Sequence, residues 1–120
     1  MLNPEIPHLF LVNAYYCGLD VHKESTYATV INVFGEVQTQ KRMKNEEILD
    51  FLEPYPSLKV AMEASTYIVP LHKKIKLKGI DITVSHPRKT KMIADSMTKN
   101  DKVDSKVLAK LLRLCALTLL

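Results

Sequence analysis

The sequence predicts an α/β domain with a mixed five-stranded β-sheet and helices on both of its faces. Three observations lead to this prediction. The first half of the chain carries three consecutive β-rich runs, and the second half alternates apolar runs with helical patterns. A length of 120 residues, with 47% hydrophobic and 25% charged side chains, is typical of one globular domain.

The first three predicted strands lie between residues 15 and 43. Residues 15–20 form a compact apolar run closed by Asp20, which is typical of a buried strand whose carboxylate emerges at its end. Residues 26–33 are rich in β-branched side chains, and a Phe-Gly-Glu turn leads from them into residues 37–43. We therefore expect a three-stranded antiparallel meander.

A short helix and two strand–helix units are expected next. Asn45 is predicted to cap a helix over residues 46–52, which has acids in its first turn and is ended by two prolines. Residues 58–62 form a predicted strand that ends at Glu63. A helix over residues 68–78, closed by a glycine, then leads to a fifth strand over residues 80–84.

Two further helices complete the expected pattern. One is predicted over residues 88–97, and the last is predicted from about residue 101. The apolar positions of the last helix predict which side faces the core, namely Val103, Val107, Leu108, Leu111 and Leu112.

The order of these elements predicts which strands are neighbours. A right-handed crossover places the fourth strand parallel to and beside the first, which gives the strand order 3-2-1-4-5 of the ribonuclease H-like fold. Asp20 and Glu63 then end neighbouring strands that are about 4.8 Å apart. Because open α/β sheets bind ligands at the carboxyl ends of their strands, this edge is the candidate site.

Two carboxylates in so small a space either bind a divalent cation or hold a proton. Asp101 and Asp104 are three residues apart, so they share one face of the predicted last helix and would complete the group from above the sheet. Each acid also has an ordinary structural explanation. In that explanation, Asp20 only starts a turn, Glu63 caps the segment that follows, and Asp101 and Asp104 complement a helix dipole.

Charge is distributed unevenly along the chain. Residues 1–71 carry a net charge of −4, whereas residues 72–113 carry +8. This asymmetry favours a surface that attracts a polyanion, with nucleic acid as the default partner, and the alternative is a set of solvated lysine-rich helices. The residues expected to contact nucleic acid are Arg88, Lys89, Lys91, Lys99 and Lys102.

The two cysteines and the chain ends carry less information. Cys17 and Cys115 are too few and too far apart for a disulfide scaffold or a zinc site, which favours a reducing, cytoplasmic compartment. Residues 1–14 are interpreted as a leader, and no run is long enough for a membrane span. Residues 111–120 are almost entirely apolar, so we expect a homodimer or a larger assembly formed through this end of the chain.

Four ordered blocks of the sequence resemble those of the DEDD transposases, which are enzymes of insertion sequences. The blocks read GLDVHK at 18–23, MEASTY at 62–67, HPR at 86–88 and KNDKVDS at 99–105. The catalytic domain of that family is similar to RuvC, the Holliday-junction resolvase, and the resemblance covers about residues 16–113. The chain departs from the family pattern in its second block, where Ser65-Thr66 replaces Thr-Gly, and in its fourth, at Asn100 and Ser105.

The resemblance implies a recombinase domain over residues 15–114 that acts on DNA with Mg²⁺, or Mn²⁺ in its place. Its metal-binding catalytic tetrad would be Asp20, Glu63, Asp101 and Asp104. It also implies that guide RNA shares in DNA recognition. The resemblance also implies a C-terminal domain with a nucleophilic serine. We expect this chain to lack that domain and residues 115–120 to form an apolar tail.

Two other interpretations of the sequence remain. The first is a non-catalytic ribonuclease H-like module that binds nucleic acid or dimerises. The second is an actin-like ATPase, which ranks below the first because the chain has only three glycines and no glycine-rich phosphate loop.

Overall fold

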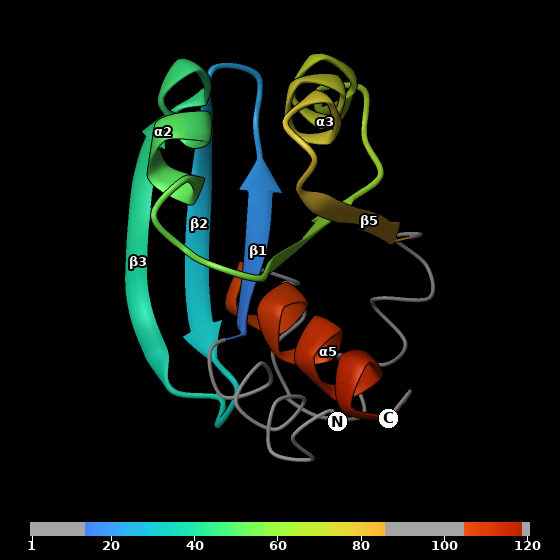
Figure 1. The fold of residues 1–120 in the computed structure, drawn as a ribbon. Helices are drawn as coiled ribbons and strands as arrows, with labels where there is room; N and C mark the ends of the chain where they lie inside the picture. The colour runs from blue at the N-terminus through green and yellow to red at the C-terminus, as the bar shows by residue number, and fades with distance from the viewer. Residues whose placement is uncertain (1–13, 86–104, 119–120) are drawn as a thin grey trace.

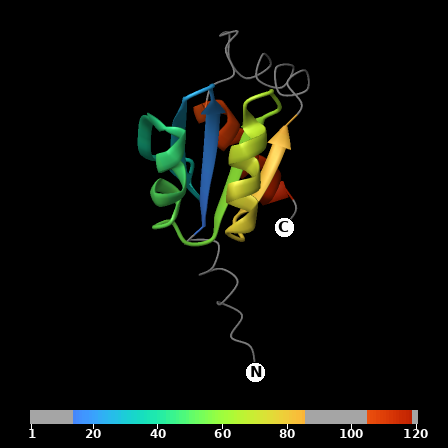
Figure 2. The ribbon, with the colours of Figure 1, turned by 90° about the horizontal axis from the view of Figure 1, so that it is seen from above.

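A computed structural model describes residues 14–85 and 105–118 as a three-layer α/β structure (Figure 1). One layer is a five-stranded sheet made of β1 (Tyr15–Val21), β2 (Ser25–Asn32), β3 (Val37–Lys44), β4 (Leu58–Glu63) and β5 (Asp81–Ser85). The short helix η1 (Asn45–Glu47) leads into α2 (Ile48–Leu52), and α3 (Ile68–Leu77) and α5 (Ser105–Thr118) complete the described elements. Figure 2 shows α2 and α3 on one face of the sheet and α5 on the other.

The strand order is β3-β2-β1-β4-β5, as the sequence predicted. β1 pairs antiparallel with β2 and parallel with β4, and β4 pairs parallel with β5. Helices cover both faces, so the predicted ribonuclease H-like topology is confirmed for the described residues. The helix expected over residues 88–97 and the leader over residues 1–14 lie outside this part of the chain, except for Ala14.

Alternation along the strands divides the core into two clusters. Odd-numbered positions of β1, such as Cys17 and Leu19, face α2 and α3 and are fully buried there with Val60, Met62 and Ile75. Cys17 is part of this core, as its place in a predicted buried strand indicated, and its burial raises the pKa of its thiol.

The even-numbered positions of β1 face α5, and Gly18 lets the helix lie directly on the strand. A Cβ added at Gly18 would lie 2.7 Å from the backbone nitrogen of Ala109 and would clash with the carbonyl oxygen of Ser105. The hydroxyls of Thr29 and Ser105 form a buried hydrogen bond of 2.6 Å beside this contact. Small residues therefore set the distance between α5 and the sheet.

The inward side of α5 differs from the one predicted. Leu108 is buried as expected, but the fully buried partners of the sheet are Ser105 and Ala109, and Leu112 and Ala116 pack next to them. Val107 and Leu111 are only partly buried, because the close contact at Gly18 turns the small residues of the helix toward β1. Val103 lies outside the described residues.

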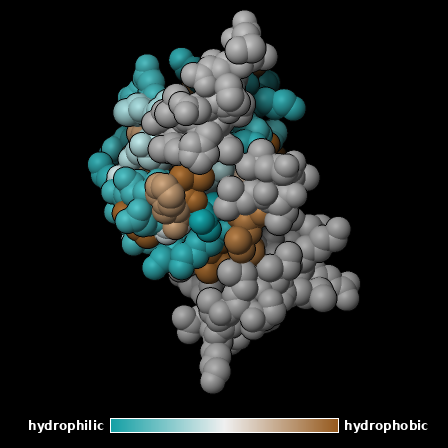
Figure 3. Space-filling model, turned by 60° about the horizontal axis from the view of Figure 1, so that its bottom comes forward, coloured by the Kyte–Doolittle hydropathy of each residue, from teal (hydrophilic) through white to brown (hydrophobic). Residues whose placement is uncertain are grey.

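The C-terminal half of α5 also presents apolar side chains to the surface. Leu114 is 43% exposed. Figure 3 shows apolar groups, in brown, between hydrophilic ones on the described surface of this side. Within the ranges that the structure describes, no helix is both long and apolar enough to cross a membrane.

The predicted role of Asn45 as a helix cap is wrong. Its side-chain nitrogen donates hydrogen bonds to the carbonyl oxygens of His22 and Lys23, at 3.1 and 3.2 Å, and its side-chain oxygen accepts one of 2.6 Å from Thr26. The side chain has no capping bond to η1. Asn45 instead ties the β1–β2 turn to the end of β3, because two unpaired turn carbonyls lie within its reach.

We expect Gly18→Ala to lower the free energy of unfolding by about 3 kcal/mol, because the new methyl group meets backbone atoms of α5 that cannot rotate away. Chemical denaturation measured by circular dichroism checks this. The control is Val69→Ala at a 67% exposed position of α3, which should change stability by no more than about 0.5 kcal/mol. Equal effects of the two variants would contradict the close contact.

Candidate functional site

Asp20 and Glu63 lie side by side at the carboxyl ends of β1 and β4. The parallel register pairs Leu19 with Met62, and each acid is the next residue of its strand. Alternation places both carboxylates on the α5 face, since their neighbours on the opposite face, Leu19 and Met62, belong to the other core cluster. The structure thus brings together the two strand-end acids that the sequence singled out.

Glu63 is held in an environment that disfavours its charged form. Its Oε2 atom is buried and has no hydrogen-bond partner among the described residues. Burial, and to a lesser extent the Asp20 carboxylate, raise the pKa of Glu63 above its ordinary value. A buried carboxylate oxygen without a donor is costly, and either a proton or a cation would satisfy it.

His22 borders the same site. Its Nε2 atom lies 3.3 Å from Oδ2 of Asp20, and its side chain is 51% exposed. The structure shows that it contacts the first acid of the pair from a turn that Asn45 holds in place.

The other predicted site residues lie outside the described part of the chain. These are the acids Asp101 and Asp104 and the basic residues Arg88, Lys89, Lys91, Lys99 and Lys102. In the described ranges alone, no group of three or more histidine, cysteine or acidic side chains could hold a metal ion. The described carboxylate site is therefore a pair.

Ser105 links this pair to the last predicted block. It is the residue that follows Asp104 in the sequence, and it begins α5. Its carbonyl oxygen lies against Gly18, two residues before Asp20, and its hydroxyl bonds to Thr29. The start of α5 is thus anchored close to the carboxyl end of β1.

A row of aligned residues extends from the pair across β2 to the edge strand β3. Asp20 is paired with Tyr27, and Tyr27 is paired with Arg42. Nothing in the sequence singles out Arg42, because an exposed arginine in a polar strand has no distinguishing signal. Only the strand register shows that it lies in line with Asp20.

A surface hollow of about 560 Å³ lies at the opposite edge of the sheet. Its lining includes Leu58 at the start of β4, Asp81 at the start of β5, and Tyr55 and Lys78 from the preceding loops. It is therefore separated from the carboxylates by the length of the parallel strands, and it is not part of the candidate site.

The chain matches one protein-family model over most of its length. A model of DEDD transposases of the IS110 type, described as "Transposase", matches residues 17–119. The chain belongs to this family. No curated protein matches it.

Solved structures show the same fold in proteins of very different sequence. RuvC from T. thermophilus, in complex with a Holliday junction substrate, matches with a TM-score of 0.58 at 10% identity, over 80% of this transposase chain and 90% of RuvC. The large terminase nuclease from the thermophilic phage G20c has a TM-score of 0.52 at 16% identity, over 69% and 49% of the two chains. A ROK-family transcriptional regulator, a homolog of the E. coli MLC protein, has a TM-score of 0.51 at 10% identity, over 72% and 31%. Together they confirm the RuvC-like, ribonuclease H-like fold.

We expect Glu63→Gln to stabilise the metal-free protein at neutral pH. Because its pKa is raised on folding, the native state holds the Glu63 proton more tightly than the unfolded state, so stability falls as the pH rises above the ordinary glutamate value. The variant has no such proton. Its melting temperature should exceed that of the wild type at pH 7 in EDTA and lose this advantage near pH 4.

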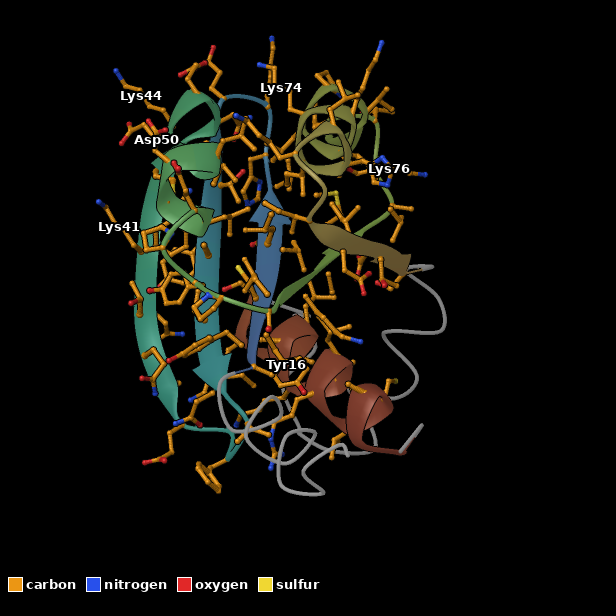
Figure 4. The ribbon with its side chains drawn as sticks, in the orientation of Figure 1. Tyr16, Lys41, Lys44, Asp50, Lys74 and Lys76 are labelled. Carbon is orange, nitrogen blue, oxygen red and sulfur yellow. The ribbon has the colours of Figure 1, made fainter. Side chains whose placement is uncertain are left out.

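The matched control is Asp50→Asn, which removes an exposed acid of α2 (Figure 4). It should leave the pH dependence of stability unchanged. An unchanged melting curve for Glu63→Gln across this pH range would contradict the unfavourable environment of that carboxyl.

Proposed function

We propose that the chain is the metal-binding catalytic domain of a DNA recombinase, and that Asp20 and Glu63 bind a divalent cation with Asp101 and Asp104. The observation that carries this proposal is the buried, unpartnered oxygen of Glu63 next to the Asp20 carboxylate. Carboxylate oxygens are the ligands that Mg²⁺ and Mn²⁺ prefer. The donor set therefore fits a hard cation.

The start of α5 supports the inclusion of Asp104. Ser105 is fixed against Gly18 and Thr29, and consecutive Cα atoms are about 3.8 Å apart. We propose that Asp104, which precedes Ser105 in the sequence, joins the site from this end of α5. Asp101 precedes it by three residues in the same sequence block.

The residues have distinct roles in this proposal. A cation held by these carboxylates would supply Lewis-acid polarisation of a phosphodiester oxygen. Glu63 would bind in its charged form, which burial disfavours, and a cation would satisfy its unpartnered oxygen. Asp20 contributes charge from the neighbouring strand, and His22 holds the orientation of that carboxylate.

The reaction is proposed to be phosphodiester cleavage and transfer in mobile-element DNA, completed together with a domain that carries a nucleophilic serine. The alternative is a non-catalytic module of the same fold. The likeness to a transcriptional regulator favours keeping this alternative, since fold alone does not imply catalysis.

We expect Glu63→Gln and Asp20→Asn each to weaken Mn²⁺ binding at least about tenfold, since each removes a charged ligand from the site. Isothermal titration calorimetry of the full chain measures this. The wild-type affinity should also rise with pH, because the raised pKa of Glu63 favours its protonated form, which does not bind a cation. Asp50→Asn is again the control, and equal affinity in all four proteins would rule out the assigned site.

DNA binding is proposed to use the basic segment after β5. We expect the triple change of Arg88, Lys89 and Lys91 to alanine to weaken binding of a short DNA duplex and to lower the slope of log affinity against log salt by up to about 2.7. The matched control changes Lys73, Lys74 and Lys76 of α3 to alanine, on the face opposite α5. Fluorescence anisotropy at several salt concentrations measures both, and identical slopes in all proteins would show that the segment is only a solvated surface.

A further inference from the structure

Arg42 and Tyr27 lie in register with the carboxylate pair on the same side of the sheet. Residues directly opposite one another on neighbouring strands point to the same face, so Arg42, Tyr27 and Asp20 share the α5 face. Two strand spacings separate the backbones of Arg42 and Asp20, roughly 10 Å. Arg42 is therefore close to the site, but it is not one of the four acids proposed to bind the metal.

The described part of α5 leaves this row uncovered. The helix begins at Ser105, which bonds to Thr29, and Thr29 is paired with Gly18. From there α5 packs toward Tyr16 and Ile31, away from the carboxyl end of β1. Tyr27 and Asp20 form the next pair on this face beyond the first residue of α5, and both are partly exposed.

The guanidinium of Arg42 is oriented by contacts that leave most of its donors unused. Its Cζ lies 5.9 Å from the centroid of the Tyr27 ring, and its Nη1 donates a hydrogen bond of 3.3 Å to the hydroxyl of Ser25. Within the described ranges no carboxylate lies within ion-pair distance of Arg42. The ring lies within cation–π distance of the guanidinium, and the N–H groups that do not bond to Ser25 remain to bind two oxygens of one phosphate.

We propose that Arg42, positioned by Tyr27, binds the DNA phosphate backbone beside the phosphodiester that the carboxylate pair acts on. This inference rests on the proposed function, because it assigns a second phosphate of the same substrate. Arg42 lies on the edge strand β3 in register with Tyr27 and Asp20, so a DNA strand that ran from Asp20 across β2 would reach it. Its positive charge offsets the repulsion between the substrate and the nearby acids, which holds DNA in register with them.

A charged edge strand also has a plain structural purpose, because exposed lysine and arginine discourage pairing with another sheet. Lys41 separates the two explanations. It is the preceding residue of β3, exposed and equally charged, but alternation places it on the opposite face from Arg42 (Figure 4). Edge protection needs both residues alike, whereas phosphate binding needs only Arg42.

The experiment compares Arg42→Gln with Lys41→Gln in the full chain, using fluorescence anisotropy with a labelled DNA duplex of defined sequence. Because Arg42→Gln loses one phosphate contact, its affinity for DNA should be about eightfold weaker than that of the wild type at about 0.1 M salt. The slope of log affinity against log salt should fall by about 0.9. Lys41→Gln should stay within about twofold of the wild type. Arg42→Lys keeps the charge and the edge protection but loses the fork, and it should show an intermediate loss.

A double-mutant cycle tests the role of Tyr27 as a positioning residue. Tyr27→Leu alone should weaken binding less than Arg42→Gln, and the double variant should be no weaker than Arg42→Gln, since the ring acts through the guanidinium. Equal losses at Arg42 and Lys41, or no loss at Arg42 in a chain that binds DNA, would overturn this inference alone. A wild-type chain that does not bind DNA would overturn both it and the proposed DNA partner, whereas calorimetry with Mn²⁺ tests the metal site separately.

Discussion

The contact between Gly18 and the start of α5 is the constraint on which the rest of this structure depends. Because Gly18 has no side chain, the helix backbone at Ser105 and Ala109 lies directly on the central strand. This contact closes the second core cluster and fixes one end of the helix two residues from Asp20. The distance between α5 and the sheet thus depends on the absence of a side chain at Gly18.

In contrast to the Gly18 contact, the carboxylate pair does not stabilise the fold, because Glu63 lies where a charged carboxylate without a ligand is unfavourable. The buried oxygen of Glu63 has no donor among the described residues, and its pKa is raised by burial and by Asp20. Residues that oppose stability in this way are common at functional sites, where the ligand supplies what the chain lacks.

The sequence predicted most of the sheet because its signals were local and strong. β-branched runs, turn residues and an apolar strand ending in an acid identified β1, β2 and β4, and the handedness rule then gave their order. It predicted the Asp20–Glu63 pair for the same reason, since parallel neighbours end at one edge. These inferences need only the period of the pattern and the order of the elements.

What the sequence could not give depends on tertiary contacts. Asn45 has the side chain of a helix cap, but the nearby carbonyl oxygens of the β1–β2 turn compete for it. The side of α5 that faces the sheet was chosen by size, and hydrophobic periodicity favoured Val107 and Leu111 over Ser105 and Ala109. The alignment of Arg42 with Asp20 exists only in the register of three strands.

The bond between Thr29 and Ser105 joins residues 76 positions apart, which has a consequence for the order of synthesis. During synthesis the five strands emerge before α5, so Tyr16 and Ile31 remain uncovered on one face of the sheet. Such contacts between distant segments slow folding and leave apolar surface open to aggregation until they form. During synthesis one face of the sheet therefore stays uncovered until the segment that carries Ser105 and Ala109 emerges, and Asp101 and Asp104 directly precede that segment in the sequence.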